Sequence, residues 1–216
     1  MYTDSIRRQM VEQQVRTWDV FDNGILATFA QVSRELYVPD AFTRCAYADV
    51  EIPIGHGQFM LRPSLQGRIL QAVNVQADDA VLEIGTGTGY LTRCLAACAR
   101  EVFSIDVYQD FVASARRRLE GDGASNVTLQ QMDASRELPV GDFDIVIVTA
   151  SIRESEARFA DLLRPGGHLF IVIGEKPVMT ATLISHDESG DLSSTSLFET
   201  DIPPLVEVDK QPPFSF

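Results

Sequence analysis

Two carboxylates and a glycine-rich turn are the residues of this chain whose types and spacing could do chemistry. Glu83 lies two residues before Gly85, where the run Gly85-Thr86-Gly87-Thr88-Gly89 begins. Asp106 follows 21 residues after Gly85, at the end of the apolar segment Val102–Asp106. Glycines let backbone N–H groups approach a ligand closely, because no Cβ stands in the way. A carboxylate about 20 residues farther on is the usual partner of ribose hydroxyls. The pattern therefore predicts an adenosine-binding site.

The spacing of the glycines argues against a dinucleotide. A dinucleotide fingerprint reads G-x-G-x-x-G and places a pyrophosphate at the N-terminus of the following helix, whereas this chain has G-x-G-x-G. Glu83 beside the turn would repel a pyrophosphate and attract a cation. S-adenosylmethionine carries an adenosine, an ammonium group and a sulfonium, and no phosphate. We expect it to be the cofactor, and a nicotinamide-dependent oxidoreductase is the less favoured alternative.

Further polar residues follow the ends of two other predicted strands. Asp133 comes after the third strand, where it could meet the adenine amino group or simply cap a turn with Ser135. Thr149 ends the fourth strand, beside the place where a reacting group would lie, because ligands of open parallel sheets bind at the carboxyl ends of strands. The residues expected around the cofactor are Glu83, Gly85, Thr86, Gly87, Gly89, Asp106, Val107, Asp133, Ala134 and Thr149.

An alternation of strands and helices must position these residues. Short apolar runs, typical of strands buried on both faces of a parallel sheet, predict strands at 80–84, 101–106, 127–131, 143–149 and 168–173. Helical patterns lie between them at 89–99, 109–120 and 154–163, and Pro165-Gly166-Gly167 is expected to end the last of these. Two more strands are expected at 178–185 and 194–201. The fold class is α/β, a doubly wound Rossmann-like sheet of seven strands.

The N-terminal part has a different pattern. Helical spacing covers 3–16, 24–32 and 65–73, and residues 45–63, which contain two prolines and two glycines, suggest a long ordered loop. The expected division is a helical N-terminal segment with a substrate-side loop (1–75), a cofactor-binding domain (76–208) and a C-terminal tail (209–216).

Composition limits the partners and the compartment. The net charge of −13 and a pI near 4.6 argue against nucleic acid, which needs a basic surface. The three cysteines (Cys45, Cys94, Cys98) and three scattered histidines do not suggest a metal site, and buried free thiols are expected. No apolar run approaches the roughly 18 residues of a membrane span, and no secretory signal is visible. We expect a soluble cytoplasmic protein without a membrane partner, either a monomer or a dimer.

Several segments together resemble the protein-L-isoaspartate O-methyltransferase family of class I methyltransferases. Val81–Tyr90 is similar to the first motif of that family, and Leu163–Gly167 to a later one. Ser33–Pro39 resembles its P-R-x-x-F-V-P segment, and Ile52–Gln58 resembles the loop that closes over the substrate. The resemblance covers about residues 5–207. It implies a class I methyltransferase sheet, S-adenosylmethionine as methyl donor, and an isoaspartyl carboxylate in a protein or peptide as acceptor.

The chain departs from the family where the acceptor is expected. The family's serine, which helps hold the substrate carboxylate, falls on Leu61, and its threonine falls on Phe59. The two glycines beside the third-strand acid are Met132 and Ala134 here. The resemblance places His56, Gln58, Leu61 and Arg62 on the acceptor side. Arg62 could hold a carboxylate bidentately, or it could be a surface arginine beside Pro63.

The sequence is therefore compatible with three functions. The first is a methyltransferase of the isoaspartyl type. The second keeps the fold and cofactor but uses a small or apolar acceptor, because Leu61 cannot donate a hydrogen bond. The third is a non-catalytic cofactor-binding or interaction protein, for the same reason.

Overall fold

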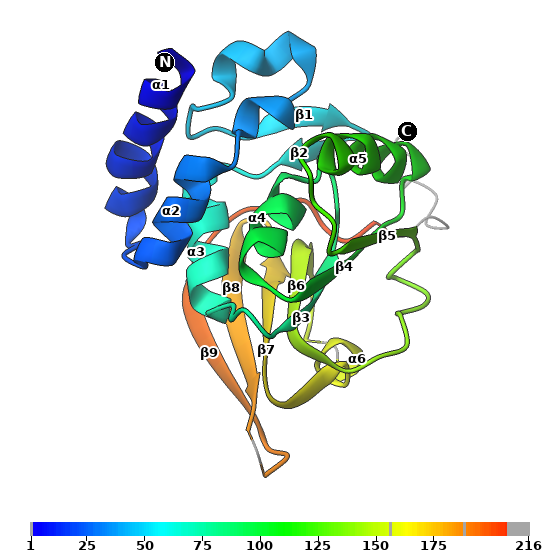
Figure 1. Cartoon of the computed structure of the whole chain (residues 1–216). Helices are drawn as coiled ribbons and strands as arrows, with labels where there is room; N and C mark the ends of the chain where they lie inside the picture. Colours follow the sequence, from blue (N-terminus) through cyan, green and yellow to red (C-terminus); the bar gives the residue numbers. More distant parts are fainter. Residues whose placement is uncertain (1, 156, 188, 207–216) are drawn as a thin grey trace, which may run out of the picture.

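A mixed sheet of seven strands runs through the centre of the protein (Figure 1). The computed structural model describes residues 2–155, 157–187 and 189–206. The strand order is β5-β4-β3-β6-β7-β8-β9; the first five strands are parallel, and β8 and β9 are antiparallel additions. The strands are β3 (Ala80–Ile84), β4 (Glu101–Asp106), β5 (Val127–Gln131), β6 (Phe143–Ile152), β7 (Leu163–Glu175), β8 (Val178–His186) and β9 (Leu192–Glu199). The predicted seven-stranded α/β sheet is confirmed.

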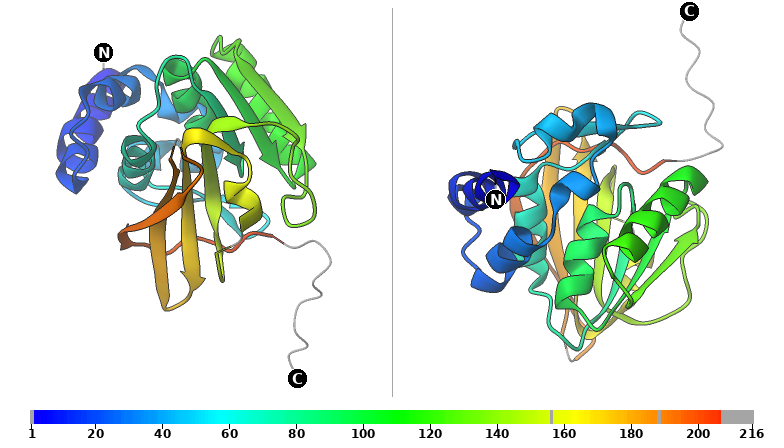
Figure 2. Two further views of the ribbon diagram at one scale, coloured as in Figure 1. Left: turned by 90° about the horizontal axis from the view of Figure 1, so that it is seen from below. Right: turned by 45° about the horizontal axis from the view of Figure 1, so that its top comes forward.

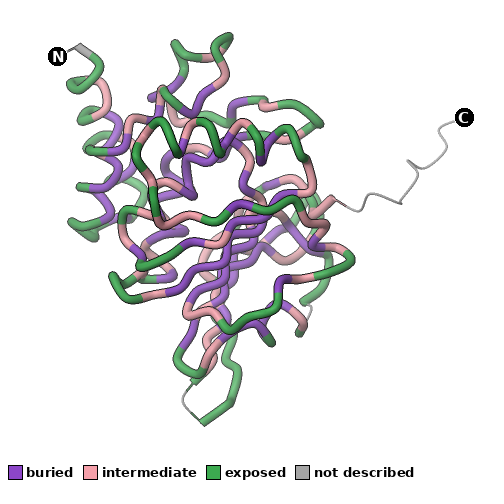
Figure 3. Tube along the Cα trace, turned by 45° about the vertical axis from the view of Figure 1, so that its right-hand side comes forward, coloured by how far each residue is buried: buried purple, intermediate pink, exposed green. Residues whose placement is uncertain are grey.

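The central strands are buried on both faces, as their continuous apolar runs predict. All five residues of β3 are buried, and side chains alternate between two core clusters. Val81 and Ile145 pack on one face, while Leu82 and Val146 pack on the other. Figure 3 shows the middle of the sheet as the most continuously buried part of the trace.

Helices cover both faces of the sheet. The helices α3 (Pro63–Val73), α4 (Tyr90–Cys98) and α5 (Gln109–Gly121) lie on one side, as the right-hand view of Figure 2 shows. The short α6 (Ala157–Ala160) contributes Phe159 to the core of the opposite face. The predicted helices at 89–99 and 109–120 are confirmed within two residues at each end.

The N-terminal segment is helical, as predicted, and packs beside α3 and α4. It contains α1 (Tyr2–Met10), a π-helical turn (Val11–Val15), a 3₁₀ turn (Arg16–Trp18) and α2 (Asn23–Gln31). Asp22 caps α2 by accepting a hydrogen bond from the Ile25 N–H at 2.9 Å. Two further 3₁₀ turns follow at Arg34–Leu36 and Asp40–Cys45. Residues of this segment share one core cluster with the sheet.

The predicted loop at 45–63 is wrong, because this stretch contains a β-hairpin. Strands β1 (Ile52–Gly55) and β2 (Gln58–Met60) pair antiparallel, with Ile52 opposite Met60. Gly55, His56 and Gly57 all have positive φ and form the turn. Pro53 and the glycines suggested a loop, but a proline is compatible with a strand of a two-stranded hairpin, whose outer edges need no ladder donor.

The predicted helix at 154–163 is also wrong in extent, because α6 spans 157–160 and β7 already begins at Leu163. Pro165-Gly166-Gly167 therefore lies within a strand and does not end a helix. The register shifts between Phe143 and Ile145, which pair with Leu163 and His168. A Cβ on Gly167 would lie 2.8 Å from the Asp144 carbonyl oxygen, so glycine is needed where the two strands approach.

Three remaining expectations concern thiols, membrane and tail. Cys94 is buried, but Cys98 is only partly buried and Cys45 is exposed, so the expectation of buried thiols holds for Cys94 alone. No helix in the described ranges is long and apolar enough to cross a membrane. The tail expected at 209–216 lies outside the described residues.

Candidate active site

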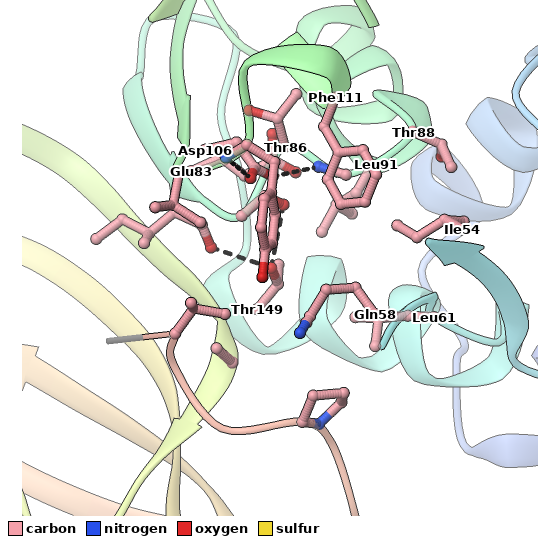
Figure 4. A pocket seen from close by; sticks show the side chains of 18 of the residues that line it. Ile54, Gln58, Leu61, Glu83, Thr86, Thr88, Leu91, Asp106, Phe111 and Thr149 are labelled. Carbon is pink, nitrogen blue, oxygen red and sulfur yellow. Dashed lines mark hydrogen bonds between the residues drawn. The ribbon is translucent and has the colours of Figure 1, made fainter. Parts of the chain in front are cut away.

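A pocket opens at the carboxyl ends of β3, β4 and β6, beneath the β1–β2 hairpin (Figure 4). The empty space at this site, with its open mouth included, is about 860 Å³. The glycine turn, the β4 end and the segment 203–206 also line it. Ser151 holds this last segment in place, because its N–H donates to the Pro203 carbonyl and its carbonyl accepts from the Leu205 N–H.

The glycine turn requires glycine for its backbone conformation and for space. Gly85, Gly87 and Gly89 have φ values of 102°, 51° and 85°, in the region that side chains rarely adopt. A Cβ on Gly85 would lie 2.1 Å from Thr149 Oγ1. That hydroxyl donates to the carbonyl oxygens of Ile84 and Gly85 at 3.0 and 3.1 Å. Thr149 therefore stabilises the turn by these hydrogen bonds and also lines the pocket.

Glu83 presents a buried carboxylate to the pocket. Its Oε2 accepts hydrogen bonds from Thr92 Oγ1 at 2.5 Å and Ser104 Oγ at 2.6 Å. Its Oε1 is buried and has no hydrogen-bond partner within the described residues. Burial raises the pKa of this carboxyl from 4.5 to about 7. An unpaired buried acid favours a cationic ligand group, because a nearby positive charge offsets the desolvation of the carboxylate.

Asp106 is held rigidly at the end of β4. Its Oδ2 accepts the Gly87 N–H at 2.9 Å and its Oδ1 accepts the Tyr108 N–H at 3.0 Å. Burial raises the pKa of this carboxyl, and the two N–H donors oppose that change. Each oxygen keeps a further lone pair for a ligand donor. The arrangement suits a pair of vicinal hydroxyls, as the sequence predicts.

An apolar slot adjoins Asp106. Val107, Tyr108 and Phe111 line one part of it, and Met132 and Ala134 line another. Flat aromatic and apolar surfaces of this kind suit a purine ring. The predicted cofactor residues Val107 and Ala134 thus lie in the pocket with Thr86 and the glycines.

Asp133 does not line the pocket. Its Oδ1 accepts from the Ser135 N–H at 3.0 Å and from Ser135 Oγ at 2.6 Å, and Arg136 lies 3.3 Å from its Oδ2. The geometry favours the turn-capping interpretation of this residue. Its neighbours Met132 and Ala134 reach the pocket in its place.

The expected acceptor residues divide into two groups. Gln58 and Leu61 line the pocket across from Glu83 and Asp106 (Figure 4). His56 does not: its Nε2 lies 3.0 Å from Asp110 Oδ2, and its ring stacks on Tyr108 with a centroid distance of 4.0 Å. Through these contacts His56 packs the β1–β2 hairpin against the start of α5.

Arg62 is also outside the pocket lining, which corrects its expected role in holding a carboxylate there. Its guanidinium carbon lies 5.1 Å from the centroid of the Trp18 ring. Leu61 is turned inward and buried, and α3 begins at Pro63, so Arg62 at the junction is directed to the N-terminal segment.

Sequence analysis missed several lining residues, among them Gln66 and Tyr90, and also missed the arginine behind these two. Gln66 and Tyr90 line the pocket, and both contact Arg34, a guanidinium with no exposed surface. Arg34 donates to Gln66 Oε1 at 2.5 Å and to the Leu61 carbonyl at 2.7 Å, and its guanidinium carbon lies 4.7 Å from the Tyr90 ring centroid. The available signal was an arginine that precedes a buried segment, Tyr37–Val38.

Comparison with known proteins decides the family. The family model described as protein-L-isoaspartate(D-aspartate) O-methyltransferase matches residues 5–210. The chain belongs to this family. A protein-L-isoaspartate O-methyltransferase of Koribacter versatilis is 32% identical over 93% of this chain and 90% of that protein. The homologous enzyme of Picosynechococcus is 33% identical over 94% of this chain and 91% of that protein.

Solved structures of protein-L-isoaspartate O-methyltransferases agree in fold. A Plasmodium falciparum structure described as such an enzyme in complex with S-adenosyl-L-homocysteine has a TM-score of 0.81 and 23% identity, and covers 93% of this chain and 98% of its own. Another protein-L-isoaspartate O-methyltransferase structure has a TM-score of 0.80 and 21% identity, and covers 93% of this chain and 66% of its own. At these identities the likeness concerns the fold alone.

Proposed function

We propose that this protein transfers a methyl group from S-adenosylmethionine to the carboxylate of an isoaspartyl residue in a protein or peptide. The family membership supports the reaction. The single structural observation that carries the proposal is the pair of buried carboxylates, Glu83 and Asp106, in one pocket with no basic side chain. Among the described residues, no histidine, lysine or arginine lines that pocket.

The residues present fit this methyl donor, which supplies the transferable methyl group on a sulfonium. The unpartnered Oε1 of Glu83 suits the ammonium group. Asp106, oriented by two backbone N–H donors, suits the ribose hydroxyls. The slot formed by Val107, Tyr108 and Phe111 suits the adenine. Among the described residues no cationic side chain lines the pocket, and Glu83 would repel a pyrophosphate, so the nicotinamide alternative loses support.

The acceptor chemistry explains why the pocket has no general base. A carboxylate already carries the lone pair that attacks the methyl group, so the protein has to orient the two reactants and keep water away. Gln58 can donate an amide N–H from β2. Leu61 and Met60 add apolar surface that excludes water beside it.

A second candidate keeps this cofactor and uses a less polar acceptor. It is favoured by Phe59 and Leu61, which place apolar side chains where the family resemblance implies hydroxyls. Labelled S-adenosylmethionine would distinguish the two. Base-labile label on an isoaspartyl peptide supports the first proposal, and label on small molecules of an extract with none on the peptide supports the second.

The cellular setting is likewise proposed. We infer a cytoplasmic enzyme that acts as a monomer or dimer. Fractionation of the source cells and sedimentation of the purified protein test these two statements.

A further inference from the structure

Arg34 is a buried cation without a counter-ion among the described residues. No aspartate or glutamate of these residues lies within ion-pair distance of it, although Asp49 attracts it from farther away, and its Nε has no hydrogen-bond partner. Burial disfavours a charged guanidinium unless other groups compensate for the lost water. The compensation here comes from two oxygens, Gln66 Oε1 and the Leu61 carbonyl, and from the face of the Tyr90 ring.

The contact with Arg34 fixes which way the Gln66 amide faces. A guanidinium can only donate hydrogen bonds, so the group that meets it at 2.5 Å must be the carbonyl oxygen of the amide. The NH₂ group then points away from Arg34. Gln66 is buried yet lines the pocket, and within the described residues its NH₂ group has no hydrogen-bond acceptor. The pocket therefore receives a fixed donor.

We propose that Arg34 is a positioning residue, which holds Gln66 so that its amide NH₂ binds a carboxylate oxygen of a bound reactant. Arg34 also polarises that amide, because a hydrogen bond to a charged donor strengthens the donors at the other end of the group. The proposal rests on the proposed function. It gives the pocket a polar donor five residues after Leu61, where the family resemblance implies a lost hydroxyl.

Both reactants carry a carboxylate, and the experiment separates them. Gln66→Glu is isosteric and keeps an oxygen toward Arg34, so an ion pair forms and the fold is retained. The oxygen that replaces the NH₂ group repels a carboxylate. Gln71→Glu is the matched control, because it makes the same change on α3 at a glutamine that contacts Phe21 and Asp19 outside the pocket.

Three measurements are compared with those of the unmodified protein. They are the Kd of S-adenosylhomocysteine, the Kd of methylthioadenosine, which lacks the carboxylate, and the KM of an isoaspartyl peptide at saturating S-adenosylmethionine. If the donor carboxylate binds Gln66, the Kd of S-adenosylhomocysteine rises about 10- to 100-fold and that of methylthioadenosine is unchanged. If the acceptor carboxylate binds, the peptide KM rises by this factor and both Kd values are unchanged.

The double variant Arg34→Met/Gln66→Leu separates loss of the Gln66 donor from the repulsion that Gln66→Glu introduces. It replaces the buried polar pair with apolar side chains of similar size, which is often tolerated by a fold. We expect a folded protein with a smaller loss in the same measurement, because leucine removes the donor without adding an oxygen that repels a carboxylate. The proposal is overturned if Gln66→Glu leaves both Kd values and the KM within threefold of those of the unmodified protein. It is also overturned if this variant weakens the binding of methylthioadenosine as much as that of S-adenosylhomocysteine. Both Kd measurements are independent of turnover, so they stand even if the isoaspartyl peptide is not methylated.

Discussion

Glu83→Gln is expected to stabilise the fold at neutral pH and to weaken cofactor binding. Burial raises the pKa of the Glu83 carboxyl from 4.5 to about 7, and this difference corresponds to about 3 kcal/mol against the ionised form. The native state therefore binds the proton more tightly than the unfolded chain. The contribution of Glu83 to the free energy of unfolding is largest below pH 4.5 and is lost as pH rises to about 7. Glutamine removes this dependence and should stabilise the protein by up to about 3 kcal/mol at pH 8.

Cofactor binding should respond in the opposite direction. An ammonium group beside Glu83 Oε1 requires the ionised carboxylate, so binding below pH 7 must release its proton. The Kd of S-adenosylhomocysteine should rise about tenfold for each pH unit below about 7 and level off above it. In the variant this pH dependence disappears. At pH 8 its Kd should be about 10- to 150-fold higher, the equivalent of one hydrogen bond to a charged group.

Calorimetry in two buffers of different ionisation enthalpy measures the Kd and the protons released, and chemical denaturation measures stability. Glu101→Gln, which changes an exposed carboxylate on β4, is the matched control. Equal Kd values for Glu83→Gln and the unmodified protein at pH 8 would refute the assignment of Glu83 to the ammonium group. If the free energy of unfolding of Glu83→Gln depended on pH in the same way as that of the unmodified protein, the argument from burial would be wrong.

Other substitutions test the rest of the pocket. Asp106→Asn should raise the Kd of S-adenosylhomocysteine tenfold or more, measured by calorimetry; an unchanged Kd would show that Asp106 does not meet the ribose. Gly85→Ala should destabilise the fold more than Gly123→Ala in denaturant titrations, because a Cβ at 85 meets Thr149 Oγ1 at 2.1 Å and one at 123 meets nothing within 4 Å. Both positions have positive φ, so equal losses of stability would mean that backbone strain, and not the contact with Thr149, determines the effect. Leu61→Ser should increase kcat/KM for an isoaspartyl peptide if an extra hydroxyl helps orient the acceptor; a decrease would favour the apolar acceptor.

The central fold was predictable because its physical signals are local. Strands such as β3 and β6 are buried on both faces and have continuous apolar runs, and a glycine-rich turn follows β3. The hairpin β1–β2 was missed because Pro53 and the two nearby glycines, Gly55 and Gly57, usually mark a loop. The start of β7 was missed because Pro165-Gly166-Gly167 has the composition that usually ends a helix. Only the pairing with β6 shows that these residues form an irregularity within a strand.

The site was predictable where function depends on strand ends. Glu83 and Asp106 follow apolar strands at a characteristic spacing, and the structure brings both into the pocket. Arg34 and Gln66 are 32 residues apart and meet only through the packing of the N-terminal segment on α3. His56 and Arg62 were chosen for their neighbours in the sequence, which cannot show the direction of a side chain at a turn or helix start.

Methyl transfer to paired peptides tests the central claim most directly. Two peptides of identical sequence, one with an isoaspartyl and one with a normal aspartyl linkage, are incubated with the protein and labelled S-adenosylmethionine. We predict base-labile label on the isoaspartyl peptide, lost in Asp106→Asn at subsaturating cofactor, and background label on the aspartyl peptide. Binding of S-adenosylhomocysteine without label above background on the isoaspartyl peptide would contradict the proposed function.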